Sequence, residues 1–340
     1  MNFKKKKFPA QIFRAYDIRG KVSFLTPELV KAIAYGLVAQ YHKVDQTQLA
    51  IGYDARLTSP EYAEIIRQVF EENGIQATII GCCSTPLLYF IARQFGGNGI
   101  MLTASHNPKT DNGIKWIIQN EPPCPAMIQQ VALDAKTAFD PLGKITNKSI
   151  QHAVVVEYCL QYQHALLQDI QLKRPFKVVL DGLNGSAGRC AALVLKKMGC
   201  ELTLIRCEAN GNFPDHAPDP SHEKHLVELR KTVLEQQADL GIALDGDGDR
   251  VVLIDEQGVI TSADRLMCLF SEMCLKMHPD HEVVYDVKCS TIVRNTVRHL
   301  GGQAKMIRTG SSFLRTYMSQ SQGRAVFGGE YAGHYVFNDG

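Results

Sequence analysis

Three aspartates alternate with two glycines in the segment Asp245-Gly-Asp-Gly-Asp-Arg250. In an extended run alternate side chains point to one side, so Asp245, Asp247 and Asp249 are expected to converge on one cation. The two glycines let the backbone bend tightly without a steric penalty. Hard oxygen ligands suit magnesium, which completes its shell with water and phosphate oxygens. The segment therefore predicts a magnesium site that meets a phosphate.

The same spacing is typical of a calcium-binding EF-hand loop. The three aspartates fill the first, third and fifth ligand positions, and Glu256 falls at the twelfth. However, Arg250 stands at the sixth position, where the EF-hand turn needs glycine. The flanks at 240–244 and 251–254 are apolar and β-branched, which predicts strands rather than helices. We therefore exclude the EF-hand, and a plain solvated acidic turn is disfavoured because adjacent carboxylates repel without a cation.

A second segment with chemical potential is Thr103-Ala-Ser-His-Asn-Pro108. Ser105 beside His106 could be a nucleophile next to a base, although serine is a weak nucleophile unless activated. The same residue types also form a capped turn, and taken alone the segment favours that turn. No Gly-x-Ser-x-Gly elbow surrounds Ser105, which argues against a hydrolase triad.

A third segment is Gly328-Gly-Glu-Tyr-Ala-Gly-His334. Glu330 and His334 could hydrogen-bond sugar hydroxyls or move protons, but alone the pattern favours a glycine-rich hairpin with an exposed glutamate. Basic residues that could hold phosphate lie at predicted strand ends or in loops, and they are Arg14, Arg19, Lys115, Arg250 and Lys288. Any one of them is by itself a common surface charge. As a set they favour a phosphate-binding function.

Strand and helix patterns alternate along the chain and must position these segments. Strands are predicted in three rounds, at 49–53, 76–80 and 99–103, then at 177–180, 201–205 and 240–244, then at 283–287, 304–308 and 325–327. Helices are predicted at 60–73, 85–95, 187–198, 221–237, 264–277, 291–300 and 312–319. Three βαβαβ-like units predict tandem α/β domains, each a three-layer α/β/α arrangement with a mixed, mostly parallel sheet.

Each first core strand ends near an aspartate, namely Asp54, Asp181 and Asp286. In open α/β sheets, ligands collect beyond the carboxyl ends of the strands. We therefore expect the three chemical segments to face one cleft between the domains. Linkers are predicted around 141–149 and 255–262.

Length and composition are those of an ordinary soluble protein. The chain has 340 residues, of which 45% are hydrophobic and 21% charged, so two or three domains are expected. The net charge of +2 gives no argument for nucleic acid or membrane partners. No apolar run is long enough to span a bilayer.

Ten cysteines occur without a Cys-x-x-Cys pair, which disfavours zinc. Cys159, Cys190, Cys268 and Cys274 fall within apolar helical patterns. Because cysteine in reducing compartments behaves as a small buried hydrophobe, we expect a cytoplasmic protein without disulfides.

The segments, taken in order, resemble the α-D-phosphohexomutase family, specifically its bacterial phosphomannomutase/phosphoglucomutase branch. The resemblance covers essentially the whole chain and rests on Phe13–Gly20, Thr103–Pro108 with Asn112–Lys115, Asp245–Arg250 and Gly329–His334. It implies an isomerase, an intramolecular phosphotransferase that interconverts hexose 1-phosphate and hexose 6-phosphate of mannose, glucose or both. The expected route passes through a phosphoserine and a 1,6-bisphosphate intermediate.

The resemblance assigns the phosphoserine to Ser105 and one Mg²⁺ per chain to Ser105, Asp245, Asp247 and Asp249, with hexose 1,6-bisphosphate as the activator. Such chemistry needs mainly positioning and neutralisation of developing charge. The other catalytic residues implied are Arg19, His106, Lys115 and Arg250. The substrate-binding residues implied are Tyr16, Lys288, Gly329, Glu330, Ala332 and His334.

Two positions of the third segment depart from the branch. Ala332 stands where serine is usual, so one hydroxyl contact is expected to be missing, and Tyr331 stands where methionine is common. Ser311 also replaces a histidine that is frequent in close relatives. These departures bear on which hexose is preferred.

The family normally has a fourth domain, whose loop grips the non-reacting phosphate, and the sequence stops at Gly340 before such a loop. We therefore expect domain I at 1–150, domain II at 151–257, an incomplete domain III at 258–340 and no domain IV. Phosphoglucosamine mutase is one alternative, and a truncated remnant that binds metal and sugar phosphate with little turnover is another. The expected partners are small hexose phosphates, without nucleic acid or membrane, and the chain is expected to be a monomer.

Overall fold

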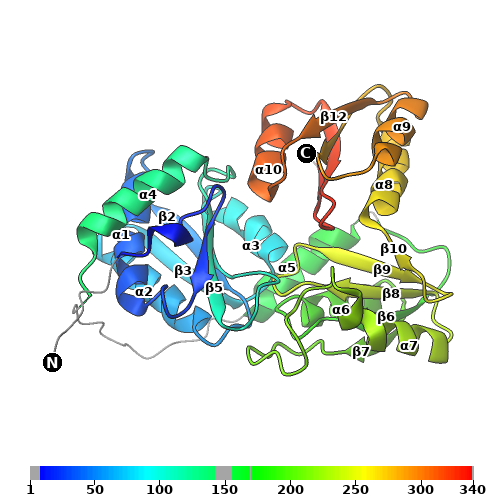
Figure 1. Cartoon of the computed structure of the whole chain (residues 1–340), viewed down its shortest axis with the longest axis horizontal. Helices are drawn as coiled ribbons and strands as arrows, with labels where there is room; N and C mark the ends of the chain where they lie inside the picture. Colours follow the sequence, from blue (N-terminus) through cyan, green and yellow to red (C-terminus); the bar gives the residue numbers. More distant parts are fainter. Residues whose placement is uncertain (1–7, 142–154, 169, 339–340) are drawn as a thin grey trace.

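The computed structural model describes residues 8–141, 155–168 and 170–338, which fold into three α/β units (Figure 1). The first unit runs from blue through cyan into green, the second from green to yellow, and the third from yellow through orange to red. The helix α5 (Val155–Leu167) lies between the first and second units. Beyond Pro141, the predicted linker at 141–149 lies outside the described residues.

The first unit is built on a five-stranded sheet with the order β1-β5-β4-β2-β3. Its strands are β1 Ile18–Lys21, β2 Gln48–Tyr53, β3 Gln76–Cys82, β4 Gly99–Leu102 and β5 Asp111–Ile117, and its helices are α1 Pro27–His42, α2 Ser59–Glu72, α3 Thr85–Ala92 and α4 Pro125–Ala138. β2, β3 and β4 are parallel, whereas β5 is antiparallel to β4 and β1. Leu49 and Ile51 of β2 pack with α1, α2 and α4, while Ala50 packs with α3 on the other face.

The second unit repeats this pattern in the order β10-β9-β8-β6-β7. Its strands are β6 Lys177–Asp181, β7 Glu201–Ile205, β8 Leu240–Leu244, β9 Val251–Asp255 and β10 Ile260–Thr261, and its helices are α6 Gly188–Lys197 and α7 Val227–Glu235. Val179 packs with α7 on one face and Leu180 with α6 on the other. β10 pairs with β9, so the second sheet runs to Thr261, inside the predicted linker at 255–262.

The third unit has the order β12-β11-β13-β14. Its strands are β11 Glu282–Asp286, β12 Gln303–Ile307, β13 Ala325–Gly329 and β14 Tyr335–Phe337, and its helices are α8 Ala263–Met277, α9 Thr291–His299 and α10 Ser311–Gln320. α8 and α9 cover one face, and α10 covers the other.

The three sheets share one topology, and this topology places the three chemical segments. Each sheet contains the same four-stranded core, in which β2, β6 or β11 is parallel to the strands on both its sides, and β4, β8 or β13 returns antiparallel into the next strand. The segments at 103–110, 245–250 and 330–334 are the loops of those three returns, β4 to β5, β8 to β9 and β13 to β14. All three loops therefore lie at the carboxyl ends of parallel strands.

The predicted α/β/α fold with mixed sheets is confirmed, and the predicted core strands match to within about two residues. One predicted helix is wrong in part: residues 221–237 form a 3₁₀ turn at Glu223–Leu226 before α7 begins at Val227. The predicted ranges also lack β1, β5, β10, β14, α1, α4 and α5. No helix among the described residues is long and apolar enough to cross a membrane.

Candidate active site

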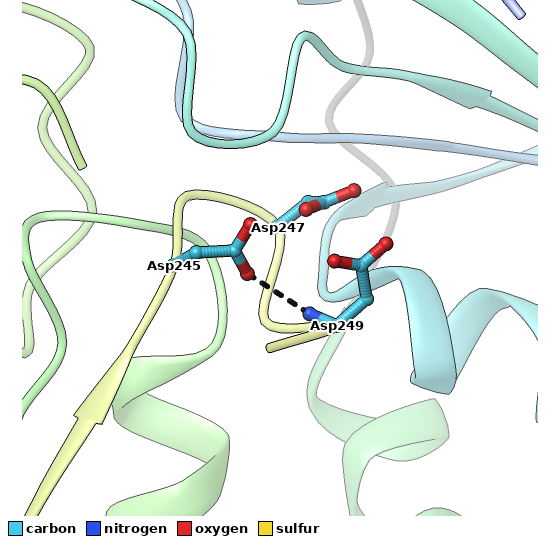
Figure 2. A group of neighbouring side chains, drawn as sticks. All are labelled: Asp245, Asp247 and Asp249. Carbon is cyan, nitrogen blue, oxygen red and sulfur yellow. Dashed lines mark hydrogen bonds between the residues drawn. The ribbon is translucent and has the colours of Figure 1, made fainter. Parts of the chain in front are cut away.

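The loop between β8 and β9 brings three carboxylates together (Figure 2). One oxygen each of Asp245, Asp247 and Asp249 lies within 4.8 Å of the others. The loop is not the extended run that the sequence predicted. It turns back, because the Gly248 N–H donates to the Asp245 carbonyl over 3.0 Å, and Gly248 adopts a φ of 67°, which glycine tolerates. The Asp245 carboxylate also accepts the Asp249 N–H at 3.1 Å, so a turn rather than strand alternation causes the convergence.

The aspartate loop has the properties of a cation site. Asp245 and Asp247 are fully buried, and within the described part of the chain Asp247 Oδ1 and Asp249 Oδ1 are buried without a hydrogen-bond partner. Burial and the charges of Asp247 and Asp249 raise the pKa of Asp245 well above its ordinary value. A hard divalent cation would satisfy the unpartnered oxygens and neutralise the repulsion. The residues present therefore fit a metal.

Lys115 on β5 joins the first unit to this loop. Its Nζ donates to Asp247 Oδ2 over 2.7 Å and to Asp249 Oδ2 over 2.8 Å. Burial disfavours the ammonium, but the carboxylates of Asp247 and Asp249 outweigh it and raise the pKa of Lys115. Thr85, the first residue of α3, adds a second link, because its hydroxyl donates to Asp247 Oδ2 over 2.6 Å.

Ser105 lies directly against the aspartate loop. Its Oγ donates to Asp245 Oδ2 over 2.6 Å and lies 3.2 Å from His106 Nδ1. Ser105 has a φ of 51°, a left-handed conformation that is uncommon for a residue with a side chain. Burial, followed by the charges of Arg250 and Arg19, lowers the pKa of His106 to about 4. A strained serine between a carboxylate and a neutral imidazole has the geometry of a group-transfer site.

Arg56 holds the Ser105 loop, and the sequence analysis did not select it. Its guanidinium is almost fully buried and donates to the carbonyl oxygens of Ser105, Asn107, Pro108 and Asp111 over 2.7 to 2.9 Å. Its Nε pairs with Asp54 Oδ2 at 3.0 Å. A single buried cation thus fixes the whole loop.

Asp54, which the sequence analysis noted at a strand end, extends this support. Its Oδ2 accepts the Thr103 hydroxyl at 2.7 Å, and Thr103 Oγ1 accepts the Ser105 N–H at 2.8 Å. The corresponding aspartates also hold loops in the other units: Asp181 pairs with Arg206, and Asp286 accepts the Thr309 hydroxyl at 2.7 Å. These strand-end aspartates therefore hold the loops in place and do not line the cleft.

Two arginines flank Ser105. Arg19 on β1 is buried and donates to the Ala104 carbonyl at 3.1 Å, and it pairs with Asp17 at 2.6 Å. Arg250 follows the third aspartate, with its Nε 3.8 Å from Asp249 Oδ1. Arg19 and Arg250 place two positive charges at the cleft, which is the arrangement that a phosphoryl group requires.

The glycine-rich loop after β13 docks onto the aspartate loop. The Val251 N–H donates to the Gly333 carbonyl at 3.1 Å, and a Cβ at Gly333 would lie 2.9 Å from the Val251 carbonyl oxygen. Glu330 is buried; its Oε1 accepts the Gly310 N–H at 2.6 Å and its Oε2 lies 3.2 Å from His334 Nδ1. The interpretation of this segment as a plain hairpin with an exposed glutamate is therefore wrong.

One cleft collects residues from all three units, as the sequence analysis expected. The predicted site residues that line it are Tyr16, Arg19, His106, Lys115, Asp249, Arg250, Glu330, Ala332 and His334. Ser105, Asp245 and Asp247 lie just beneath its surface and are buried. Gly329 is buried at the end of β13, where a Cβ would meet Met267 at 3.0 Å. Lys288 is exposed and does not line the described cleft.

The cleft also contains residues that the sequence analysis did not assign to the site. Among them are Thr309, Ser312 and Arg315 of the third unit. Arg14, which the sequence analysis named among the basic residues that could hold phosphate, also lines the cleft. The Arg315 guanidinium lies 4.2 Å from the centre of the Tyr89 ring on α3, so the third unit closes over the first. No local motif marks Arg315 or Tyr89; only the way the units pack brings them together.

Comparison with known families assigns each unit separately. Residues 10–137, 157–258 and 262–340 match domains I, II and III, respectively, of the family described as phosphoglucomutase/phosphomannomutase, alpha/beta/alpha domain. These three matches follow one another in order and together cover most of the chain.

Individual relatives agree with these matches. The chain is 35% identical over 334 residues to a phosphoglucomutase of Neisseria meningitidis serogroup A, covering 96% of this chain and 70% of the relative. It is 36% identical over 343 residues to a phosphomannomutase/phosphoglucomutase of Pseudomonas putida, covering 98% and 72%. A crystal structure of a phosphoglucomutase/phosphomannomutase family protein from Burkholderia thailandensis is similar at 31% identity with a TM-score of 0.88, covering 97% and 72%. Neither alternative, phosphoglucosamine mutase or binding remnant, is favoured by these relatives.

Proposed function

Because this chain belongs to the phosphoglucomutase/phosphomannomutase family, we propose that it is an isomerase that moves a phosphoryl group between the 1- and 6-positions of a hexose phosphate. Ser105 carries the phosphoryl group between the two half-reactions. The substrate is a phosphate of glucose, mannose or both, in keeping with the names of the relatives.

The observation that carries this proposal is the meeting of three loops from three units in one cleft. Ser105 supplies an oxygen nucleophile that is hydrogen-bonded to Asp245 at 2.6 Å. Arg19, Lys115 and Arg250 supply positive charge around it. Phosphoryl transfer depends on such positioning and charge neutralisation more than on covalent chemistry.

Each cleft residue has a proposed role. Ser105 Oγ loses its proton toward Asp245 Oδ2 or His106 Nδ1, which are the acceptors within hydrogen-bond distance. Arg19 and Arg250 bind the non-bridging phosphoryl oxygens. Lys115 Nζ holds a proton that it can deliver to the oxygen that leaves the phosphorus atom.

The cation site of the aspartate loop fits Mg²⁺, which would be held by Asp245, Asp247 and Asp249 together with an oxygen on Ser105. When bound, this ion supplies charge neutralisation at the phosphoryl group. Lys115 Nζ donates to Asp247 Oδ2 and Asp249 Oδ2, so this ammonium would compete with the ion for these two carboxylates.

The loop at 330–334 is proposed to hold the sugar. Glu330 is oriented by Gly310 and His334, and its carboxylate can accept further hydrogen bonds from sugar hydroxyls. Ala332 lines the cleft without a polar group, so the hydroxyl contact expected of a serine there is missing. Hexose 1,6-bisphosphate is proposed as the activator that phosphorylates Ser105.

A coupled assay tests the function. The chain is incubated with Mg²⁺, a trace of glucose 1,6-bisphosphate and glucose 1-phosphate or mannose 1-phosphate, and the 6-phosphate is followed by a dehydrogenase. The wild type is expected to convert substrate, and the Ser105→Ala variant is expected to lose the conversion. Ser23→Ala changes an exposed serine of the same unit and is expected to keep it. No conversion by the wild type, or full conversion by Ser105→Ala, would contradict the proposal.

A further inference from the structure

A second cavity is separate from the active-site cleft and has several cysteines in its wall. It has a volume of about 350 Å³ and is bounded by α5, α6 and the residues that follow β3 and β7. Of the described residues that line it, five are cysteines: Cys82, Cys83, Cys159, Cys190 and Cys207. The catalytic roles proposed above use none of these thiols.

Two of the thiols lie close enough to react with one another. Cys159 on α5 and Cys190 on α6 are both free, and their sulfur atoms are 2.6 Å apart. A disulfide needs a separation of about 2.05 Å, so a small movement of the two side chains would form one. The two residues are distant in sequence and belong to helices that pack against each other.

The pair is chemically asymmetric. The hydrogen bond from Cys190, aided by one from Gln163 Nε2 at 3.5 Å and by the charges of Arg189 and Lys197, lowers the pKa of Cys159 to about 7 against the effect of burial. The same hydrogen bond, together with burial, raises the pKa of Cys190. Cys159 is therefore the nucleophilic thiolate, and Cys190 remains the protonated partner.

A small reagent can reach the pair. Leu160 and Leu193 line the same cavity and are 48% and 41% exposed, so the cavity opens to the surface. Cys190 is itself partly exposed, whereas Cys159 is 8% exposed. This access suits a peroxide and disfavours a bulky reagent.

We propose that Cys159 and Cys190 form a reversible disulfide with hydrogen peroxide as the oxidant. The Cys159 thiolate attacks one peroxide oxygen, the O–O bond breaks, and hydroxide leaves and becomes water, so that Cys159 becomes a sulfenic acid. The Cys190 sulfur then attacks the Cys159 sulfur, the S–O bond breaks, and the hydroxyl leaves as water with the Cys190 proton. Two thiols are oxidised and one peroxide is reduced to two waters. A dithiol reductant reverses the bond by exchange.

The disulfide would restrict movement of the aspartate loop relative to the first unit. Cys190 is in the first turn of α6, four residues after Ser186, whose N–H and hydroxyl both donate to the Gly246 carbonyl at 3.0 and 3.2 Å. A Cβ at Gly248 would lie 2.3 Å from the Ala187 Cβ, so the aspartate loop rests on the start of α6. α5 in turn packs against α3 and β3 of the first unit. The bond therefore ties the aspartate loop to the first unit through α6 and α5.

Peptide mapping tests the site without any assumption about catalysis. The reduced chain is treated with one equivalent of hydrogen peroxide, the remaining thiols are alkylated, and the digest is analysed by mass spectrometry. The wild type is expected to lose two alkylatable thiols, those of Cys159 and Cys190, and to yield one linked pair of peptides that dithiothreitol separates. Preferential oxidation of the exposed Cys124, with no linked pair, would overturn the proposal.

Variants resolve the order of the two steps. In Cys190→Ala, a dimedone adduct is expected on Cys159, because the sulfenic acid has no partner. In Cys159→Ala, Cys190 is expected to stay unmodified, and a faster adduct on Cys190 than on Cys159 would contradict the assigned roles. Cys207→Ala removes another thiol of the same cavity and is expected to keep the linked pair. Hydrogen exchange at residues 185–187 and 246–248 is expected to slow on oxidation of the wild type, and unchanged exchange would contradict the coupling to the aspartate loop.

Discussion

Ser105 Oγ donates a 2.6 Å hydrogen bond to Asp245 Oδ2, although 140 residues and a change of domain separate the two. The contact exists because each residue lies in the loop at the same position of a repeated sheet topology, after β4 in one unit and after β8 in the next. When the carboxyl ends of the parallel strands of two such units point toward each other, these loops come into contact. The nucleophile and the cation site are therefore produced by the packing of domains.

Removing one carboxylate of the aspartate loop should weaken cation binding. For Asp245→Asn we expect the affinity for Mg²⁺ to fall about 30-fold, because one charge-assisted ligand worth about 2 kcal/mol is lost. Isothermal titration with Mg²⁺, repeated with Mn²⁺, measures the change. Asp239→Asn, at a surface ion pair of the same domain, is the control and should bind as the wild type does. Equal affinities of Asp245→Asn and wild type would exclude this aspartate as a ligand.

Lys115 should affect metal binding and turnover in opposite directions. In Lys115→Met we expect Mg²⁺ to bind at least as tightly as in the wild type, because the ammonium that competes for Asp247 and Asp249 is gone. Turnover should nevertheless fall about 100-fold or more, as is usual when a proton-transfer group is lost. Titration and the coupled assay give the two values, and the exposed Lys109→Met is the control. Weaker metal binding in Lys115→Met would show that the lysine supports the site instead of competing for it.

Arg56 should stabilise the first domain as well as the Ser105 loop. Arg56→Met leaves the buried Asp54 carboxylate without its cationic partner, so we expect the free energy of unfolding to fall by about 3 to 5 kcal/mol. The melting temperature of domain I should then fall by about 10 °C. Calorimetry measures this transition. Arg67→Met removes a more exposed arginine that pairs with Glu64 and Glu71 on α2 of the same domain, and its effect should stay below about 1 kcal/mol. Similar melting points for both variants would contradict the role of Arg56.

Cys159 should show an unusual pH dependence. Because its pKa is lowered to about 7, the thiolate is present above pH 7 and is lost as the pH falls below it. The rate of alkylation of Cys159 by iodoacetamide, followed by peptide mass spectrometry, should therefore reach half its maximum near pH 7. In Cys190→Ala the hydrogen bond is absent, so the midpoint should move up toward the ordinary value of about 8.5. A midpoint that is the same in both proteins would show that Cys190 does not set it.

The sequence predicted the parallel strands and the three loops, because buried strands and chemical motifs are local patterns. Most of the residues that it proposed for the site lie in or just beneath one cleft. It missed β5, whose Asn112 and Gly113 are typical of turns. The pairing of β5 with β1 and β4 outweighs that preference, and a Cβ at Gly113 would lie 2.6 Å from the Ile18 carbonyl oxygen. Glycine is there because the backbones pack closely, which no local pattern reveals.

The residues that support the site were harder to predict. Arg56 follows a strand without any motif, and its role depends on a loop about 50 residues further along the chain. Cys159 and Cys190 were interpreted as small apolar residues of two helices, and only the packing of α5 on α6 makes them a pair. The family resemblance assigned Lys288 to substrate binding, but its side chain is exposed and does not line the described cleft, so its role stays a prediction.

Phosphate on Ser105 is the most direct test of the proposed mechanism. The chain is incubated with glucose 1,6-bisphosphate and Mg²⁺, quenched, digested and mapped by mass spectrometry. We predict one phosphoryl group on the peptide that contains Ser105, its loss when glucose 1-phosphate is added in excess over the bisphosphate, and no phosphate on Ser105→Ala at this position. A wild-type chain that carries no phosphate on Ser105 under these conditions, or that carries it at another residue, would contradict the mechanism.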